Sequence, residues 1–166
     1  DRRSWLPLLM VPPLSILAYA PLLLSIEGSG ILGIGIVPEG SAISSFLLVH
    51  GFFIAVFLLY GWRVLCRYPW LLVIPLVGWY AGYGAAGIAL LAALLIALRR
   101  EWRGEEILAI AGLLVITLCE LIYLKDGMGA DYFRMNTVFK FYMGAWVMTV
   151  SYTHLRAHET VLDIVC

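Results

Sequence analysis

The sequence predicts an all-α protein, a polytopic bundle of transmembrane helices with about five spans or parts of spans. The 166 residues are 63% hydrophobic and 13% charged, whereas soluble domains have about 45–50% apolar and about 25% charged residues. The apolar residues also form long uncharged runs of the kind that crosses a bilayer. A soluble globule, a disordered segment and a nucleic-acid-binding protein are therefore poor interpretations, and the expected environment is a lipid bilayer.

Both ends of the chain read differently from its middle. The sequence opens at Asp1 without an initiator Met, and the long proline-rich run that follows lacks a cleavage site, so we expect residues 1–149 to be a fragment of a larger multi-span membrane domain. Residues 150–166 begin VSYTHLRAHET, which resembles a translated sequencing-library adapter of the kind that ends many metagenomic reading frames. Polar and charged residues there interrupt an apolar run that needs about 20 residues to span. We therefore expect this tail to be non-native.

The first predicted span is Trp5–Ile26, which is long enough as a helix to cross about 30 Å of hydrocarbon. Its prolines remove backbone hydrogen bonds, and inside a membrane only neighbouring helices, waters or side chains replace them. We therefore expect this span to be buried among other helices. The glycine-rich segment from Glu27 to Ser41 predicts an irregular loop outside the membrane.

The second predicted span runs from Ala42 to Trp62 and is followed by Arg63 and Arg67. His50 lies within it. An ionisable residue inside a span is a functional candidate by default. A lone histidine at a helix contact, hydrogen-bonded to a carbonyl, is more often structural, and this is the role we expect for His50.

The uncharged stretch Trp70–Leu98 has an awkward length. As one helix it would be roughly 43 Å long, more than tilt usually absorbs, while two full spans need about 40 residues. Its centre, GWYAGYGAAG, suits a re-entrant break at the membrane interface and equally suits a close helix contact through Gly78 and Gly82. The sequence leaves both arrangements open.

A charged connector, Arg99–Glu106, leads to a further predicted span, Ile107–Leu124. Cytoplasmic loops are rich in Lys and Arg, and the amino end is cytoplasmic in this interpretation because its side carries Arg2, Arg3, Arg63 and Arg67. If Trp70–Leu98 crosses once, the loop after Ile107–Leu124 is cytoplasmic. If it crosses twice, that loop lies outside, and the count of basic residues allows either.

This last loop and its flanks are the most informative part of the sequence. Acidic, basic, amide and phenol side chains gather there at one membrane interface: Glu120, Asp126, Arg134, Asn136, Lys140 and Tyr142. A carboxylate inside a span costs roughly 2.5–3.5 kcal/mol even on lenient insertion scales, so Glu120 needs a partner. Lys140 on the following helix would lie at similar depth, and we expect the two to pair or to share a ligand. The alternative is a hairpin whose charged ends only reach the head groups.

Two strings carry a resemblance to a known family. RMNTVFKFY (Arg134–Tyr142), preceded by ELIYLKD (Glu120–Asp126), resembles the signature of the YYY family of large uncharacterised prokaryotic integral-membrane proteins. The segment Gly30–Gly51 is similar to a loop and helix of that family, and the resemblance extends to Thr149. The linker DGMGADYF is longer than the usual spacer. The resemblance implies an integral protein of a prokaryotic plasma membrane.

That family is similar in layout to C-type membrane glycosyltransferases, which use lipid-phosphate-linked sugars. The resemblance implies a site for a polyprenyl-phosphate sugar, completed by an acidic motif expected upstream in the remainder of the chain. Arg134 and Lys140 would hold the phosphate, with Asn136 and Tyr142 positioning it. Glu120 or Asp126 would orient an acceptor or a cation. No cofactor is expected.

A second function from a different class stays open. The chain would then be a transporter or scaffold in which Glu120, His50 and Lys140 form an intramembrane ion network. No metal site is expected, because the cysteines are not spaced as ligands.

Overall fold

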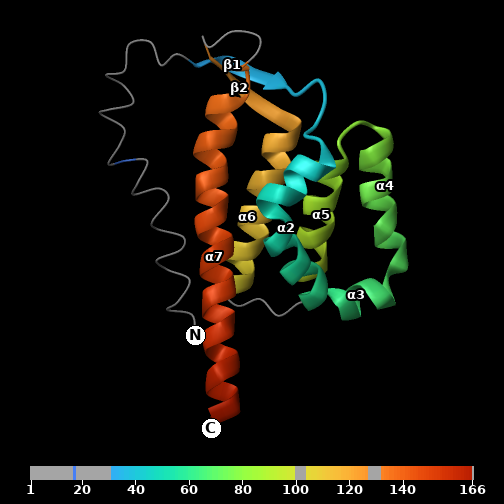
Figure 1. Ribbon diagram of the computed structural model, residues 1–166, viewed down its shortest axis with the longest axis vertical. Helices are drawn as coiled ribbons and strands as arrows, with labels where there is room; N and C mark the ends of the chain where they lie inside the picture. The colour runs from blue at the N-terminus through green and yellow to red at the C-terminus, as the bar shows by residue number, and fades with distance from the viewer. Residues whose placement is uncertain (1–16, 18–30, 100–103, 127–131, 166) are drawn as a thin grey trace.

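The computed structural model describes Leu17 and residues 31–99, 104–126 and 132–165, with side chains for all of these except 31, 32, 126 and 156–165. The first predicted span lies outside the described residues, apart from Leu17. In chain order the elements are β1 (Ile31–Ile36), α2 (Ile43–Tyr60), α3 (Trp62–Arg67), the 3-10 helix η2 (Pro69–Leu72), α4 (Val73–Tyr80), α5 (Gly84–Ala97), α6 (Gly104–Leu121), β2 (Ile122–Asp126) and α7 (Met135–Val165) (Figure 1). The predicted all-α class is confirmed.

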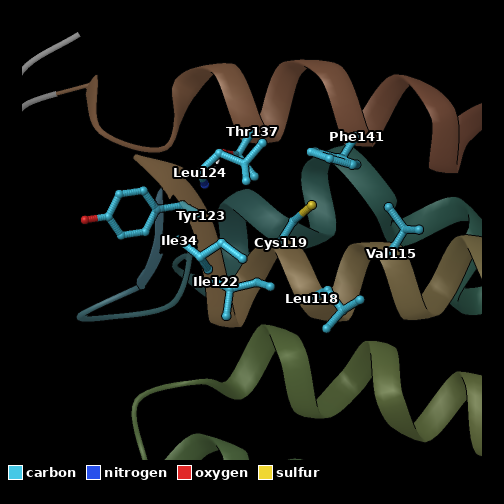
Figure 2. A pocket seen from close by; sticks show the side chains of 9 residues that line it. All are labelled: Ile34, Val115, Leu118, Cys119, Ile122, Tyr123, Leu124, Thr137 and Phe141. Atoms are coloured by element: carbon cyan, nitrogen blue, oxygen red, sulfur yellow. Dashed lines mark hydrogen bonds between the residues drawn. The ribbon is translucent and has the colours of Figure 1, made fainter. Parts of the chain in front are cut away.

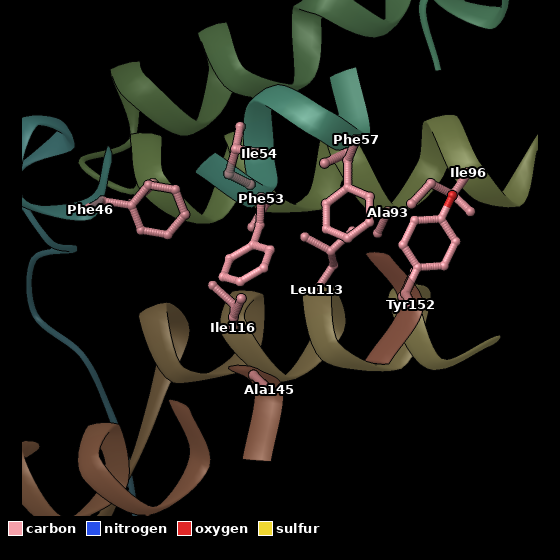
Figure 3. Packing of buried hydrophobic residues seen from close by; sticks show 14 residues of the cluster. Phe46, Phe53, Ile54, Phe57, Ala93, Ile96, Leu113, Ile116, Ala145 and Tyr152 are labelled. Atoms are coloured by element: carbon pink, nitrogen blue, oxygen red, sulfur yellow. The ribbon is translucent and has the colours of Figure 1, made fainter. Parts of the chain in front are cut away.

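Helices α2, α5, α6 and α7 form the bundle, and α4 packs on α5 (Figure 1). Their shared core contains large side chains such as Phe57 and Leu113, which face one another between the helices (Figure 3). Helix α5 presents mostly alanine and glycine to its neighbours, and Ala85, Ala89 and Ala92 are fully buried. Small residues let helix backbones approach closely, which is how helices associate where lipid removes the hydrophobic driving force.

The stretch Trp70–Leu98 folds as a helical hairpin. Helix α4 ends at Tyr80, and the turn passes through Gly82, whose φ of 83° is unfavourable for any residue with a Cβ. The two helices then touch where Gly78 faces Gly87. The turn is therefore present, and a close glycine contact accompanies it, but the partner of Gly78 is Gly87 and not the expected Gly82, which lies in the turn. Helix α5 returns the chain to the end of the bundle where α4 began (Figure 1).

A two-stranded ribbon corrects two expectations. Strand β1 lies within the segment Glu27–Ser41, which was expected to be irregular, and pairs antiparallel with β2. The span expected to reach Leu124 ends as a helix at Leu121, because its next residues join the ribbon. The Val37 N–H donates to the Leu121 carbonyl at 2.9 Å, which satisfies one of the acceptors that a helix leaves open at its carboxyl end.

The helices differ in whether they are long and apolar enough to cross a bilayer. Among the residues that the structure describes, α2 is the one helix both long and apolar enough to span by itself, which agrees with the predicted span Ala42–Trp62. Helices α4 and α5 are apolar but shorter. Helix α7 continues to Val165 without a break. The interpretation of residues 150–166 as a non-native tail stays a prediction.

The glycine contact between α4 and α5 generates a first prediction. In Gly87→Ala the new Cβ would lie 2.8 Å from the Pro75 Cα and 3.1 Å from the Ile74 oxygen, so the helices must separate. We expect a loss of about 1–3 kcal/mol of unfolding free energy, measured as a lower thermal midpoint in detergent. Gly144→Ala on α7 is the control, since its Cβ would meet nothing within 4 Å. Equal midpoints for the two variants would contradict the contact.

Candidate functional site

The carboxylate of Glu120 is the centre of the site. It lies one residue before the end of α6 and is 0% exposed. Its oxygens accept hydrogen bonds from the Tyr142 hydroxyl at 2.5 Å and from Arg134 Nη2 at 2.8 Å. The Ser41 N–H and hydroxyl donate two more, at 2.7 and 3.0 Å. Buried charges are tolerated when they are paired and hydrogen-bonded in this way.

Arg134 is the ionic partner of Glu120, so the expected pairing with Lys140 is wrong. Arg134 lies just before α7, and its Nη2 also donates to the Cys119 carbonyl at 3.0 Å. Lys140 is exposed on α7, and two residues along a helix turn a side chain by about 200°, away from the face that carries Tyr142. Arg134 reaches Glu120 because its position before the helix frees it from this constraint.

The Nε–H group of Arg134 has no hydrogen-bond acceptor among the described residues. The side chain is 18% exposed, and its Nη2 carries both hydrogen bonds. The Nε atom itself is buried. A buried donor without a partner is costly and marks a place where an acceptor would bind favourably.

Ser41 was not foreseen as part of the site. It ends the turn Val37–Ser41, which connects β1 to α2 and is held in place by Tyr83, whose hydroxyl donates to the Val37 carbonyl at 2.7 Å. This turn is fixed across the end of α6 and so brings the serine to Glu120. A serine just before a predicted helix was the available sequence signal, but it indicates a helix cap, not a contact with a distant carboxylate.

His50 lies beside this network on α2. It is fully buried, and its Nδ1 accepts a hydrogen bond from the Trp146 indole at 3.3 Å, so its partner is an indole and not the expected carbonyl. Its ring centroid is 5.1 Å from that of Phe46 and 4.6 Å from that of Tyr142. Tyr142 therefore contacts both His50 and Glu120, while Lys140 does not complete the predicted ion network.

The remaining predicted residues lie around this centre. Asn136 is half-buried in the first turn of α7, and Asp126 ends β2 opposite Ile31. The structure therefore brings together Glu120, Arg134 and Tyr142 from the predicted set. With its oxygens occupied by donors, Glu120 acts as an acceptor that positions other groups, and Arg134 is the group with unused hydrogen-bonding capacity.

The buried ion pair generates a second prediction. Arg134→Gln leaves an unpaired buried carboxylate, and we expect it to cost about 3–5 kcal/mol of unfolding free energy. The double variant with Glu120→Gln should recover much of this loss. Lys140→Gln should stay within about 0.5 kcal/mol of the wild type, because Lys140 is exposed. Denaturation in mixed micelles measures all three, and a larger loss in Lys140→Gln than in Arg134→Gln would restore the original pairing.

Comparison with known proteins places the chain in a family. No curated protein and no solved structure matches it. The family described as "Uncharacterized membrane protein (DUF2298)" matches residues 1–149, a range that contains the whole Glu120 network. The match agrees with the bilayer environment predicted from composition. The chain therefore belongs to the DUF2298 family of uncharacterized membrane proteins.

Proposed function

We propose that this chain forms part of a membrane glycosyltransferase that uses a polyprenyl-phosphate-linked sugar in a prokaryotic plasma membrane. The sequence resemblance to C-type enzymes motivates the class of reaction. The observation that carries the proposal is the buried Nε–H of Arg134, which has no acceptor among the described residues although Nη2 of the same guanidinium makes two hydrogen bonds. A phosphate oxygen is a strong acceptor for such a donor.

In this proposal Arg134 contacts the lipid phosphate, and Glu120 is a positioning residue. The carboxylate fixes the guanidinium through Nη2, and Tyr142 fixes the carboxylate in turn. Glu120 also balances the charge of Arg134. In this proposal the site therefore recognises the phosphate through directed hydrogen bonds more than through net electrostatic attraction. Asn136, in the adjacent turn of α7, is suited to position the sugar phosphate.

The proposal requires the site to face the outside of the cell, because C-type enzymes act on lipid-linked sugars there. Two arrangements support this orientation. The α4–α5 hairpin returns the chain to the end of the bundle where α4 began, and the β1–β2 ribbon lies at the opposite end of the bundle from α3 (Figure 1). Helix α3 carries Arg63 and Arg67, and such basic residues favour the cytoplasmic side.

Cysteine labelling tests the orientation. In a Cys166→Ser background, Lys125→Cys on β2 should react with a membrane-impermeant maleimide in intact cells. The native Cys66, which is exposed on α3, should react only after permeabilisation and serves as the internal control. Reaction of Lys125→Cys only from the cytoplasmic side would count heavily against the enzyme.

Lipid binding tests the phosphate contact. Arg134→Lys retains the positive charge opposite Glu120 and removes the Nε–H donor. We expect affinity for a polyprenyl-phosphate sugar in detergent to fall about tenfold to a hundredfold, with little change in thermal midpoint. Arg63→Lys, at the other end of the bundle, is the matched control. Equal affinities for the wild type and both variants would reject Arg134 as the phosphate ligand.

A transporter or scaffold is the second candidate. The contact of Tyr142 with both His50 and Glu120 favours it, since this contact joins two buried ionisable groups inside the bundle. The two classes are separable in proteoliposomes. Charge movement that is lost in Glu120→Gln would support transport, whereas sugar transfer by the full-length protein would support the enzyme.

A further inference from the structure

A small apolar groove lies on the other flank of the α6–α7 seam. It has a volume of about 140 Å³ and is lined by Ile34, Val115, Leu118, Cys119, Ile122, Tyr123, Leu124, Thr137 and Phe141 (Figure 2). The oxygen of Thr137 already accepts a hydrogen bond from the Leu124 N–H at 2.9 Å. The lining therefore presents hydrocarbon. An apolar cavity of about 150 Å³ holds a molecule the size of benzene, so this groove admits a few carbons of a single chain.

The groove is distinct from the Glu120 network. Cys119 and Phe141 line it, while their chain neighbours Glu120 and Tyr142 hydrogen-bond to each other. Successive residues on a helix point about 100° apart. The groove and the carboxylate network therefore occupy different sides of the same two helices.

The groove opens to the outside of the bundle. Ile34 is 66% exposed and Leu118 is 51% exposed, and both line it. In a membrane protein, an exposed apolar surface of this kind is suited to contact with lipid. Apolar side chains at such a mouth are stable when a hydrocarbon chain covers them.

Two lysines lie beside the lining residues of the groove, at the edge of the face that lines it. Lys125 follows the lining residue Leu124 on β2, and Lys140 lies between the lining residues Thr137 and Phe141 on α7. Both lysines are exposed, and neither makes an ion pair or hydrogen bond with another described residue. Glu120, the buried acid at this end, is already paired with Arg134. The two lysines are thus available to an anion.

We infer that this groove binds one acyl chain of an anionic bilayer phospholipid, whose phosphate lies at Lys125 and Lys140. The apolar lining accounts for the chain, the exposed mouth for entry from the bilayer, and the two lysines for the negative head group. This inference does not depend on the proposed function, because it uses neither Arg134 nor the Glu120 carboxylate.

Native mass spectrometry after reconstitution tests the inference. The full chain is placed in nanodiscs of phosphatidylcholine with a minority of phosphatidylglycerol, and the lipid retained on the released protein is identified. We expect one retained phosphatidylglycerol. The double variant Lys125→Gln/Lys140→Gln should bind it about thirtyfold more weakly, and Leu118→Trp, which fills the mouth, should lose it.

Matched controls separate binding from folding. Arg67→Gln removes an exposed charge at the far end, and Leu59→Trp enlarges an exposed residue of α2, so both should retain the lipid with the affinity of the wild type. Equal retention in all variants, or equal retention of phosphatidylcholine, would overturn the inference. Displacement of phosphatidylglycerol by an equimolar polyprenyl phosphate would also overturn it and would assign the groove to the lipid substrate.

Discussion

The buried carboxylate of Glu120 is the constraint on which one end of this bundle depends. Removing a charge from water costs several kcal/mol, and this cost is offset only when the geometry of the compensating groups is good. Here those groups come from two separate parts of the chain: Ser41 from the turn before α2, and Arg134 and Tyr142 from the region around the start of α7. A shift of the turn before α2, or of α7, would break hydrogen bonds to a charge that has no access to water. The network therefore fixes α2, α6 and α7 relative to one another.

The middle of the bundle is held by close packing of small residues. The alanines of α5 allow neighbouring helices to approach on several sides, and the glycine contact lets α4 fold back against α5. Dispersion forces act only over short distances. In lipid they stabilise helix contacts best where small residues let the two backbones approach closely. The protein thus combines polar fixation at one end with apolar packing along its length.

Much of the fold was predictable because hydrophobicity and chain length are local properties. The span expected from Ala42 to Trp62 corresponds to α2, and the glycine-rich centre of Trp70–Leu98 is the turn of a hairpin. The β1–β2 ribbon was not predicted, because the sequence of neither strand indicates which distant segment it pairs with. The membrane class follows from composition and agrees with the family match.

The candidate site was predictable in part for a related reason. The need of Glu120 for a partner follows from the cost of burying charge, and Tyr142 and Arg134 were among the candidates. The choice of Arg134 over Lys140 depends on the path of the loop before α7, and sequence spacing does not give that path. Ser41 lies 79 residues from Glu120 in the chain, so its contribution depends on the tertiary fold.

The order of Ser41, Glu120 and Arg134 along the chain has a consequence for biosynthesis. Glu120 is made after Ser41 but 14 residues before Arg134. At about 5–20 residues per second, the arginine follows about 1–3 s later. Ser41, which belongs to an earlier segment, is therefore a partner of the carboxylate that is already synthesised when Glu120 is added. The order of synthesis thus makes Ser41 the first of the three hydrogen-bond partners of Glu120 to be available.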